Sequence, residues 1–487
     1  MKFLTAIFAF TLASAAAGAD AKTNFVFFLV DDLGFMDVGF NNPDTFYETP
    51  NCDRLAREGM ILSDAYAACQ VCSPTRSSIM CGKYPARTDA TNFFSGKRGG
   101  RFQSAEMVDR MALEEVTIAE ALKEGGYTTC FAGKWHLGPE GFWPTDQGFD
   151  YNFGGGSNGL PRSYFEPYKN VENLSPRKEG DYLTKRLADE SCGFLEAAED
   201  QPFLLYLAFY NVHTPLQAPK NLVEKYKVKA EKLGLTDEAG RFDSKRERQV
   251  WPDTKQPRKV RIRQDHAVYA AMMESMDNAV GQVAAKLDEL GLSDDTAIFF
   301  MSDNGGLSTS EGLPTSNLPL RGGKGWMYEG GVREPVFVKW PGVTKPGSSC
   351  SHPVISTDFF PTILEMAGLP AKPEQHVDGV SFAALLRDPE AKLDRDAIFW
   401  HYPHYANQGG IPASAVRMGD LKLIQDLETG DDELYDLSAD LAEQKNVAAQ
   451  HPEKVEAMRK RLRDWRTEVD AKMLRPNPKT GEAPPEL

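Results

Sequence analysis

The 487-residue sequence lacks an excess of positive charge. It carries 55 Lys and Arg against 70 Asp and Glu, which gives a formal net charge of -15. Because binding to a phosphate backbone needs a basic footprint, this balance argues against nucleic acid as a main partner. A chain of this length can bury a large core and form two domains.

The sequence also lacks an apolar run long enough to cross a bilayer, which needs about 20 residues. One lysine, an apolar run at residues 3–12 and a series of small residues open the chain. This order is typical of a secretory signal peptide cleaved near Ala17 or Ala19. We therefore predict a signal peptide at residues 1–19, a secreted or periplasmic protein, and no membrane anchor.

Cysteines are few and odd in number. The seven are Cys52, Cys69, Cys72, Cys81, Cys130, Cys192 and Cys350. An exported protein can form disulfides, but an odd number leaves at least one thiol unpaired. Cys72 is our candidate for that thiol, and the pairing of the other six stays open.

Four apolar runs end in polar residues. Runs of this length, separated by helix-like stretches at residues 116–126 and 269–291, are typical of buried strands in a largely parallel sheet. In such sheets ligands bind beyond the carboxyl ends of the strands. We therefore expect an α/β fold that brings these side chains to one edge. The runs at 24–30, 127–133, 202–210 and 296–302 lead into Asp31 and Asp32, Lys134 and His136, His213, and Asp303 and Asn304.

The acids and the amide in this set indicate a metal site. Asp31, Asp32, Asp303 and Asn304 offer only oxygen ligands, which suit a hard cation better than zinc. The chain has 8 histidines and none is spaced as H-x-x-x-H, so a two-zinc site would lack ligands. We expect Ca²⁺, with Mg²⁺ as the second choice.

Cys72 precedes a short stretch that is typical of a helix start, because Pro74 is well tolerated at the first helical position. Free N–H groups and the helix dipole at that place favour an anion, and Arg76 lies one turn further on. A thiolate with a lowered pKa is one interpretation. The other interpretation of Cys72 from these residues is a structural disulfide.

The stretch from Cys72 to Arg76, CSPTR, resembles the C-x-P-x-R signature of the type I sulfatases. Further similarities follow the order of that family: the early DD, then GKYP, GKWHLG, NVHTPL, SDNGG and GGKGWMYEGGVREP, over roughly residues 23–440. The sequence is most similar to the arylsulfatase A-like group and its bacterial carbohydrate sulfatases. The resemblance implies an alkaline-phosphatase-like fold, a mixed, largely parallel sheet between helices.

The resemblance also implies roles for residues. Cys72 would be oxidised to formylglycine (3-oxoalanine) by a formylglycine-generating enzyme, and its hydrate would attack the sulfur of a sulfate ester. The cation would be held by Asp31, Asp32, Asp303, Asn304 and the modified residue 72. Arg76 and Lys134 would stabilise sulfate oxygens, His213 and Lys324 would face the bridging oxygen, and His136 would take a proton from the second hydroxyl.

The remaining sequence suggests four segments: the signal peptide, a catalytic domain at 23–388, a C-terminal subdomain at 389–473 and a disordered tail at 474–487. Short alternating runs and a helical stretch at 451–470 predict an antiparallel sheet plus helix for the subdomain. Long loops in compact domains are often functional. We expect Arg162 and Tyr164 in the loop at 154–174, and His404 in the subdomain, to bind substrate.

The function expected from these features is an exported sulfatase that acts on sulfated carbohydrates. The resemblance leans toward 4-O-sulfated galactose or N-acetylgalactosamine units of a polysaccharide. A phosphodiesterase or phosphonate monoester hydrolase of the same superfamily is the alternative, and a glycan-binding pseudoenzyme is a third hypothesis. The complete set of catalytic and metal residues argues against the third.

The modification of Cys72 is directly testable. Trypsin releases residues 58–76 as one peptide, which contains both Cys69 and Cys72. In active protein from its own host, mass spectrometry should find Cys72 with its thiol carbon oxidised to an aldehyde and Cys69 unchanged. An unmodified Cys72 in active protein would contradict the assignment.

Overall fold

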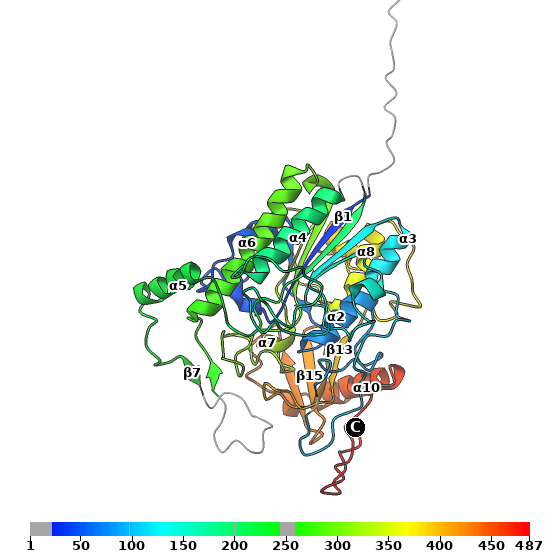
Figure 1. Ribbon diagram of the computed structural model, residues 1–487. Coiled ribbons are helices and arrows are strands. Elements are labelled where there is room, and N and C mark those ends of the chain that lie inside the picture. Colours follow the sequence, from blue (N-terminus) through cyan, green and yellow to red (C-terminus); the bar gives the residue numbers. More distant parts are fainter. Residues whose placement is uncertain (1–21, 97, 199–200, 244–258) are drawn as a thin grey trace, which may run out of the picture.

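The computed structural model describes residues 22–96, 98–198, 201–243 and 259–487 (Figure 1). The predicted signal peptide at residues 1–19 lies outside them. Within the described ranges, no helix combines the length and the apolar character needed to cross a membrane. All seven cysteines are buried and unpaired, so none of the disulfides left open by the sequence is present.

The core of the molecule is an eight-stranded sheet in the order β11-β2-β10-β9-β1-β6-β4-β5. Neighbouring strands run parallel except for β10, which is antiparallel to both β9 and β2. The predicted mixed, largely parallel sheet is therefore confirmed. Its strands are β1 (Asn24–Val30), β2 (Met60–Leu62), β4 (Thr128–Gly133), β5 (Tyr151–Phe153), β6 (Phe203–Ala208), β9 (Thr296–Ser302), β10 (Val336–Lys339) and β11 (Ser348–Cys350).

Helices cover both faces of this sheet (Figure 1). Because side chains alternate along a strand, Phe25 and Phe27 of β1 enter one apolar cluster and Val26 and Phe28 enter the other. The first cluster is completed by α2 (Cys72–Cys81), α3 (Ile118–Glu124), α8 (Phe359–Met366) and α9 (Ala383–Arg387). The second is completed by α1 (Pro50–Glu58), α4 (Leu183–Ala197), α5 (Lys220–Lys232) and α6 (Ala267–Glu289). Every residue of β1 is buried, which explains its continuous apolar sequence.

The helix boundaries differ from the sequence expectation at their ends. The helix α3 starts after Thr117, whose hydroxyl accepts the Glu120 N–H in a capping box. The helix α2 starts at Cys72, two residues before the expected Pro74, with Val71 as its N-cap. Residue 72 therefore lies in the first helical position rather than before it.

A second, four-stranded antiparallel sheet forms the C-terminal subdomain, at the bottom of Figure 1. Its strands are β13 (Ile398–Tyr402), β14 (Ala413–Met418), β15 (Leu421–Asp426) and β16 (Asp432–Asp436), and α10 (Pro452–Glu468) packs across them. Phe399 stacks on Trp465 with ring centroids 4.7 Å apart. The expected antiparallel sheet plus helix is present.

The segment 474–487, predicted as a disordered tail, begins with two residues that contact the rest of the chain. Leu474 is buried with Phe102, Tyr405 and Leu427, and Arg475 exchanges two backbone hydrogen bonds with Gln103. The apolar side chain of Leu474 and the backbone pairing of Arg475 with Gln103 hold these two residues against the rest of the chain.

The other strands and the remaining α-helix are short: β3 (Ala65–Tyr66) pairs with β12 (Val354–Ile355), β7 (Phe242–Asp243) pairs with β8 (Val260–Arg261), and α7 spans Glu329–Val332.

A buried group of charges joins the two parts. Lys422 of β15 lies 2.8 Å from Glu329 of α7 and 2.9 Å from Glu443, and all three side chains are fully buried. Arg333 contacts Glu329 from the other side, at 2.6 Å. Because a buried charge without a partner is costly, each member depends on the others.

Replacing Lys422 with Met should therefore destabilise the protein strongly. The change leaves two buried carboxylates facing each other, and loss of one member of a buried ion pair costs about 3–5 kcal/mol. The free energy of unfolding from denaturant titration measures this loss. Lys445→Met removes an exposed lysine from the same subdomain as a control, and equal stability of the two variants would contradict the role of this network.

Candidate active site

The carboxyl ends of four neighbouring strands and the first turn of α2 meet at one place. Asp31 and Asp32 follow β1, Lys134 and His136 follow β4, His213 follows β6, and Asp303 and Asn304 follow β9. Since β9, β1, β6 and β4 are adjacent in the sheet, their polar ends are neighbours. All ten predicted catalytic and metal residues are buried there: Asp31, Asp32, Cys72, Arg76, Lys134, His136, His213, Asp303, Asn304 and Lys324.

Three carboxylates stand at the centre of this site. Asp31, Asp32 and Asp303 each place an oxygen within 4.8 Å of the others. Oδ1 of Asp31 and Oδ1 of Asn304 are buried and have no hydrogen-bond partner. Buried polar atoms are rarely left without a partner, and oxygen ligands suit Ca²⁺ or Mg²⁺. The donor set and the two unpaired oxygens therefore fit a hard divalent cation.

Three cationic side chains surround the acids. Lys134 Nζ lies 2.6 Å from Asp31 Oδ2, and Lys324 Nζ lies 2.8 Å from Asp32. Arg76 donates from Nε to Asp303 Oδ2 at 2.8 Å and from Nη1 to the Lys134 carbonyl at 2.6 Å. Each buried acid thus has its own cationic partner. The same three cationic side chains can also attract an anionic substrate.

The electrostatics separate the two adjacent aspartates. Burial raises the pKa of Asp31 well above its usual range, although Lys134 opposes the change. Burial also acts on Asp32, but Lys324, His213 and Lys134 lower its pKa to about 2. Asp32 is therefore held as a carboxylate, whereas Asp31 is costly to ionise without an added positive charge.

Cys72 faces His136 in the first turn of α2. Its Sγ lies 3.5 Å from His136 Nδ1, and Ser73 Oγ lies 3.2 Å from the same nitrogen. Burial raises the pKa of the Cys72 thiol, in spite of Lys134 and Lys324. The interpretation of residue 72 as a stabilised thiolate is therefore not supported, because burial outweighs these cations. A neutral thiol fits a precursor of a modified residue.

The two histidines are neutral and fixed in orientation. Burial, with Lys134 and Arg76, keeps the pKa of His136 well below its usual range, and burial with Lys324 lowers that of His213 to about 4. His213 Nδ1 lies 2.9 Å from the Thr214 carbonyl, which only accepts hydrogen bonds. The proton of His213 is therefore on Nδ1, and Nε2 faces Asp32 at 3.6 Å.

Two residues of the site have an unfavourable backbone conformation. Asp32 has φ of 63° and His136 has φ of 57°, in the left-handed region that non-glycine residues rarely adopt. The ring of His136 is covered by Gly159, where a Cβ would lie 2.5 Å from the ring carbon Cε1. Such strain persists where the surrounding structure holds a functional geometry.

Two of the three predicted substrate residues do not present their side chains to a ligand. Tyr164 is fully buried, and its hydroxyl donates to the carbonyls of Tyr210 and His213, so it holds the loop of His213. His404 is also buried, with Nε2 2.8 Å from Thr91 Oγ1. Both positions were predicted from loop location, which does not reveal burial. Arg162 is exposed on its loop.

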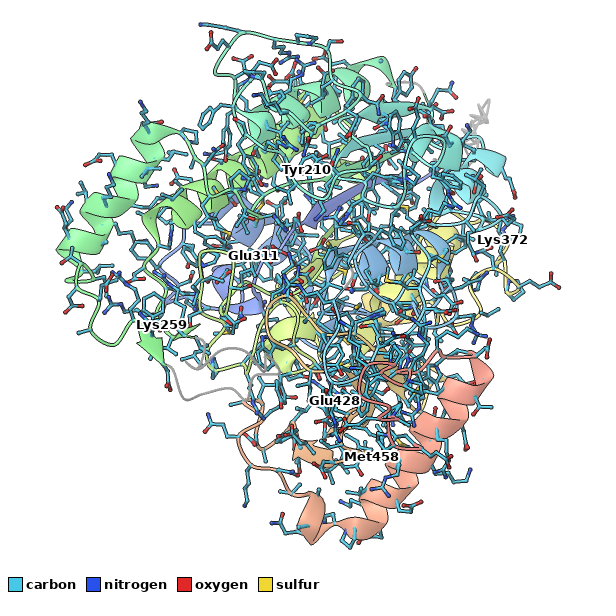
Figure 2. All side chains as sticks on the ribbon, turned by 60° about the horizontal axis from the view of Figure 1, so that its bottom comes forward. Tyr210, Lys259, Glu311, Lys372, Glu428 and Met458 are labelled. Atoms are coloured by element: carbon cyan, nitrogen blue, oxygen red, sulfur yellow. The ribbon has the colours of Figure 1, made fainter. Side chains whose placement is uncertain are left out.

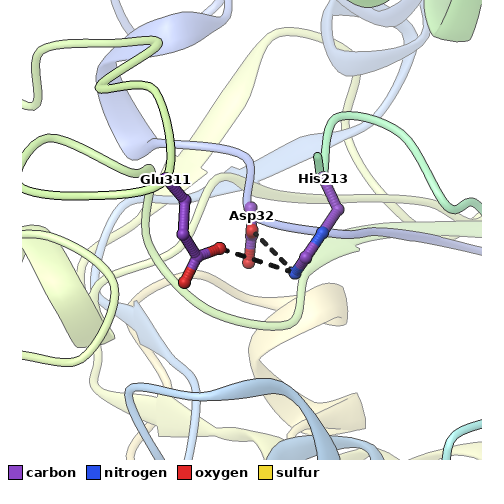
Figure 3. Close-up of side chains that lie close together, drawn as sticks. All are labelled: Asp32, His213 and Glu311. Carbon is purple, nitrogen blue, oxygen red and sulfur yellow. Dashed lines mark ion pairs between the residues drawn. The ribbon is translucent and has the colours of Figure 1, made fainter. Parts of the chain in front are cut away.

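The sequence reasoning missed Ser73, Glu311 and Gln408. Ser73 occupies the variable position of C-x-P-x-R, where its hydroxyl was the available signal. Glu311 and Gln408 lie in two loops without periodicity, and only the structure brings them together, with Gln408 Nε2 donating to Glu311 Oε1 at 2.8 Å. Figure 3 shows Asp32, His213 and Glu311 converging at the site.

Comparisons with known proteins agree with this geometry. The sulfatase family model matches residues 23–369, and the model of the N-sulphoglucosamine sulphohydrolase C-terminal region matches residues 323–468. A sulfatase of Formosa agariphila is 31% identical, covering 93% of this chain and 91% of the relative. The N-acetylgalactosamine-6-sulfatase of Canis lupus familiaris is 32% identical over 75% of this chain and 66% of its own length.

Among solved structures, Ps i-CgsB in complex with k-i-k-neocarrahexaose superimposes with a TM-score of 0.72 and is 29% identical. The match covers 91% of this chain and 92% of that one. The chain therefore belongs to the sulfatase family and is a sulfuric ester hydrolase, and the fold is that of sulfatases and alkaline phosphatase.

The acids predict a measurable response to metal. Ca²⁺ should stabilise the wild-type protein, by about 2.7 kcal/mol at one hundred times its dissociation constant. Asp31→Asn should abolish most of this response, and it should also lower the stability without metal, because buried Lys134 loses its carboxylate partner. Thermal unfolding with Ca²⁺, with Mg²⁺ and with chelator measures both effects. Asp109→Asn, at an exposed position, is the control, and an unchanged response in Asp31→Asn would refute the site.

Proposed function

We propose that this sulfatase is exported and removes sulfate from carbohydrates, with 4-O-sulfated galactose or N-acetylgalactosamine units as its substrate. The observation that carries the carbohydrate class is the likeness to Ps i-CgsB, which extends over 91% of this chain and whose structure contains a hexaose. The galactose unit and the 4-position rest on the sequence resemblance alone. The name of the N-acetylgalactosamine-6-sulfatase relative gives the 6-position of N-acetylgalactosamine, not the 4-position proposed for this chain.

A cleft beside the site supports a substrate larger than a simple ester. It has a volume of about 1050 Å³, and its walls include Phe94, Arg110, Gly138, Phe142 and Ser157. The Phe94 N–H donates to Ser73 Oγ, which itself contacts His136, so one wall of the cleft lies next to the first turn of α2. Aromatic rings and a guanidinium are suited to a sulfated sugar chain, since the rings cover apolar sugar faces and arginine binds sulfate oxygens.

The reaction is assigned to groups of this chain. The cation would be held by Asp31, Asp32, Asp303 and Asn304, and with formylglycine at residue 72 it would supply an activated nucleophile and charge stabilisation. Lys134 and Arg76 stabilise negative charge on the sulfate. Their buried positions, at 0% and 2% exposure, keep water from screening them.

The two histidines have opposite tasks in proton transfer. His213 turns Nε2 toward Asp32, because Nδ1 is held on the Thr214 carbonyl, and Nε2 must take up a proton before it can pass one to the departing alcohol. Lys324 assists there through its positive charge. His136 lies within 3.5 Å of residue 72 and takes a proton from it. Its neutral state, maintained by burial and neighbouring cations, is the one that can accept.

Sulfate release from a defined panel tests the substrate. Protein with residue 72 confirmed as modified is assayed on saccharides that differ in sugar and sulfate position, with an aryl sulfate and a phosphate diester alongside. We expect selective release from 4-O-sulfated galactose or N-acetylgalactosamine. Release from another sugar or position would reject the substrate assignment and keep the chemistry. Cleavage of the diester alone would contradict the proposed reaction.

A further inference from the structure

One acidic side chain lies beside His213, the residue assigned above to the departing alcohol. Oε2 of Glu311 is 3.9 Å from His213 Nε2, and Figure 3 shows Glu311 and Asp32 on the same side of that nitrogen, with Asp32 drawn between the other two residues. The Glu311 side chain is 28% exposed, whereas His213 and Asp32 are almost completely buried. Glu311 therefore lies at the opening of the site, near the middle of the view in Figure 2. It is not among the groups that the reaction above requires.

The position of Glu311 is fixed by two contacts and by strain. Gln408 Nε2 donates to its Oε1 at 2.8 Å, which leaves Oε2 directed toward His213. Gln408 is itself buried, and its carbonyl accepts from Thr309 Oγ1 at 2.9 Å. Glu311 has φ of 52° and Leu313 has φ of 46°, both unfavourable for residues with a side chain. Strained backbone conformations cluster at functional sites, and here the strained loop places a carboxylate beside His213.

The charge of Glu311 limits what can lie beside the leaving oxygen. An ionised carboxylate only accepts hydrogen bonds, so it attracts a hydroxyl and repels another anion. The remaining charged groups around His213 are Lys324, Asp32 and Lys134, and both lysines are engaged by Asp32 and Asp31 at 2.8 Å and 2.6 Å. The charge of Glu311 helps to raise the pKa of Lys324, yet no lysine or arginine among the described residues forms an ion pair with Glu311, which leaves Oε2 to His213 and to a ligand.

We propose that Glu311, held by Gln408, is a specificity-determining residue that binds a free hydroxyl on the carbon next to the sulfate ester. The inference rests on the proposed function, because it takes His213 Nε2 as the neighbour of the leaving oxygen. An adjacent hydroxyl of a sugar lies about one hydrogen-bond length from that oxygen, within reach of Oε2. The preferred substrate is therefore a monosulfated vicinal diol, and a second sulfate on the neighbouring carbon is rejected.

The test compares three galactosides in the wild type and in Glu311→Gln: the 4-sulfate, its 3-deoxy analogue and the 3,4-disulfate. The variant keeps the size of the side chain and loses the charge. We expect the wild type to prefer the 4-sulfate over the 3-deoxy analogue at least tenfold in kcat/KM, since a hydrogen bond to a charged group is stronger than one between neutral groups. In Glu311→Gln this ratio should fall toward one, and the preference for monosulfate over disulfate should fall at least tenfold.

Two further variants make the result specific. Gln408→Leu should reduce the same ratios by releasing Glu311, whereas Glu224→Gln, an exposed carboxylate on α5, should leave them unchanged. Equal ratios in wild type and Glu311→Gln would overturn the inference. If the wild type releases sulfate from another saccharide of the panel instead, the same three-member series is built on that sugar. Failure of the wild type on every sulfate ester would reject the proposed function itself.

Discussion

The structure of the site depends on the neutralisation of three buried carboxylates within 4.8 Å of one another. Asp31, Asp32 and Asp303 would repel each other strongly in this low-dielectric place if nothing compensated them. Lys134, Lys324 and Arg76 supply that compensation at distances of 2.6–2.8 Å. Two oxygens that still lack partners make room for one further positive charge. The same arrangement that permits the acids to be buried therefore prepares the site for a cation and for an anionic ester.

The C-terminal subdomain contributes residues to the edge of this site. Its loop after β13 approaches the loop of Lys324 so closely that a Cβ on Gly410 would lie 1.7 Å from the Gly325 carbonyl. The buried charges around Lys422 and Glu329 fix α7, which begins five residues after Lys324. Gln408 then reaches Glu311 across the same contact. The opening of the active site is thus built from both parts of the chain, and the apolar cluster of the subdomain likewise includes Tyr66, Val71 and Trp326 of the catalytic part.

The sequence indicated the polar residues at the strand ends more clearly than it indicated the loop residues that surround them. Strand ends are recognisable because β1 and β9 are continuous apolar runs followed at once by acids, and parallel strands bring their ends to one edge. The roles of Cys72, His136 and Lys324 came from a family resemblance that the family match supports. The burial of Tyr164 and His404 was not predicted, because both sit in loops whose burial has no periodic signal. Glu311 was missed for the same reason.

The replacement of Cys72 with Ser tests the central claim most directly. A serine hydroxyl can occupy the same first position of α2, but it cannot be oxidised to formylglycine in this way and has no second hydroxyl from which His136 could remove a proton. With an aryl sulfate, the account predicts at most one alcohol released per enzyme molecule and no free sulfate, while Ca²⁺ still stabilises the protein through Asp31, Asp32, Asp303 and Asn304. Continued turnover with release of sulfate by Cys72→Ser would contradict the account.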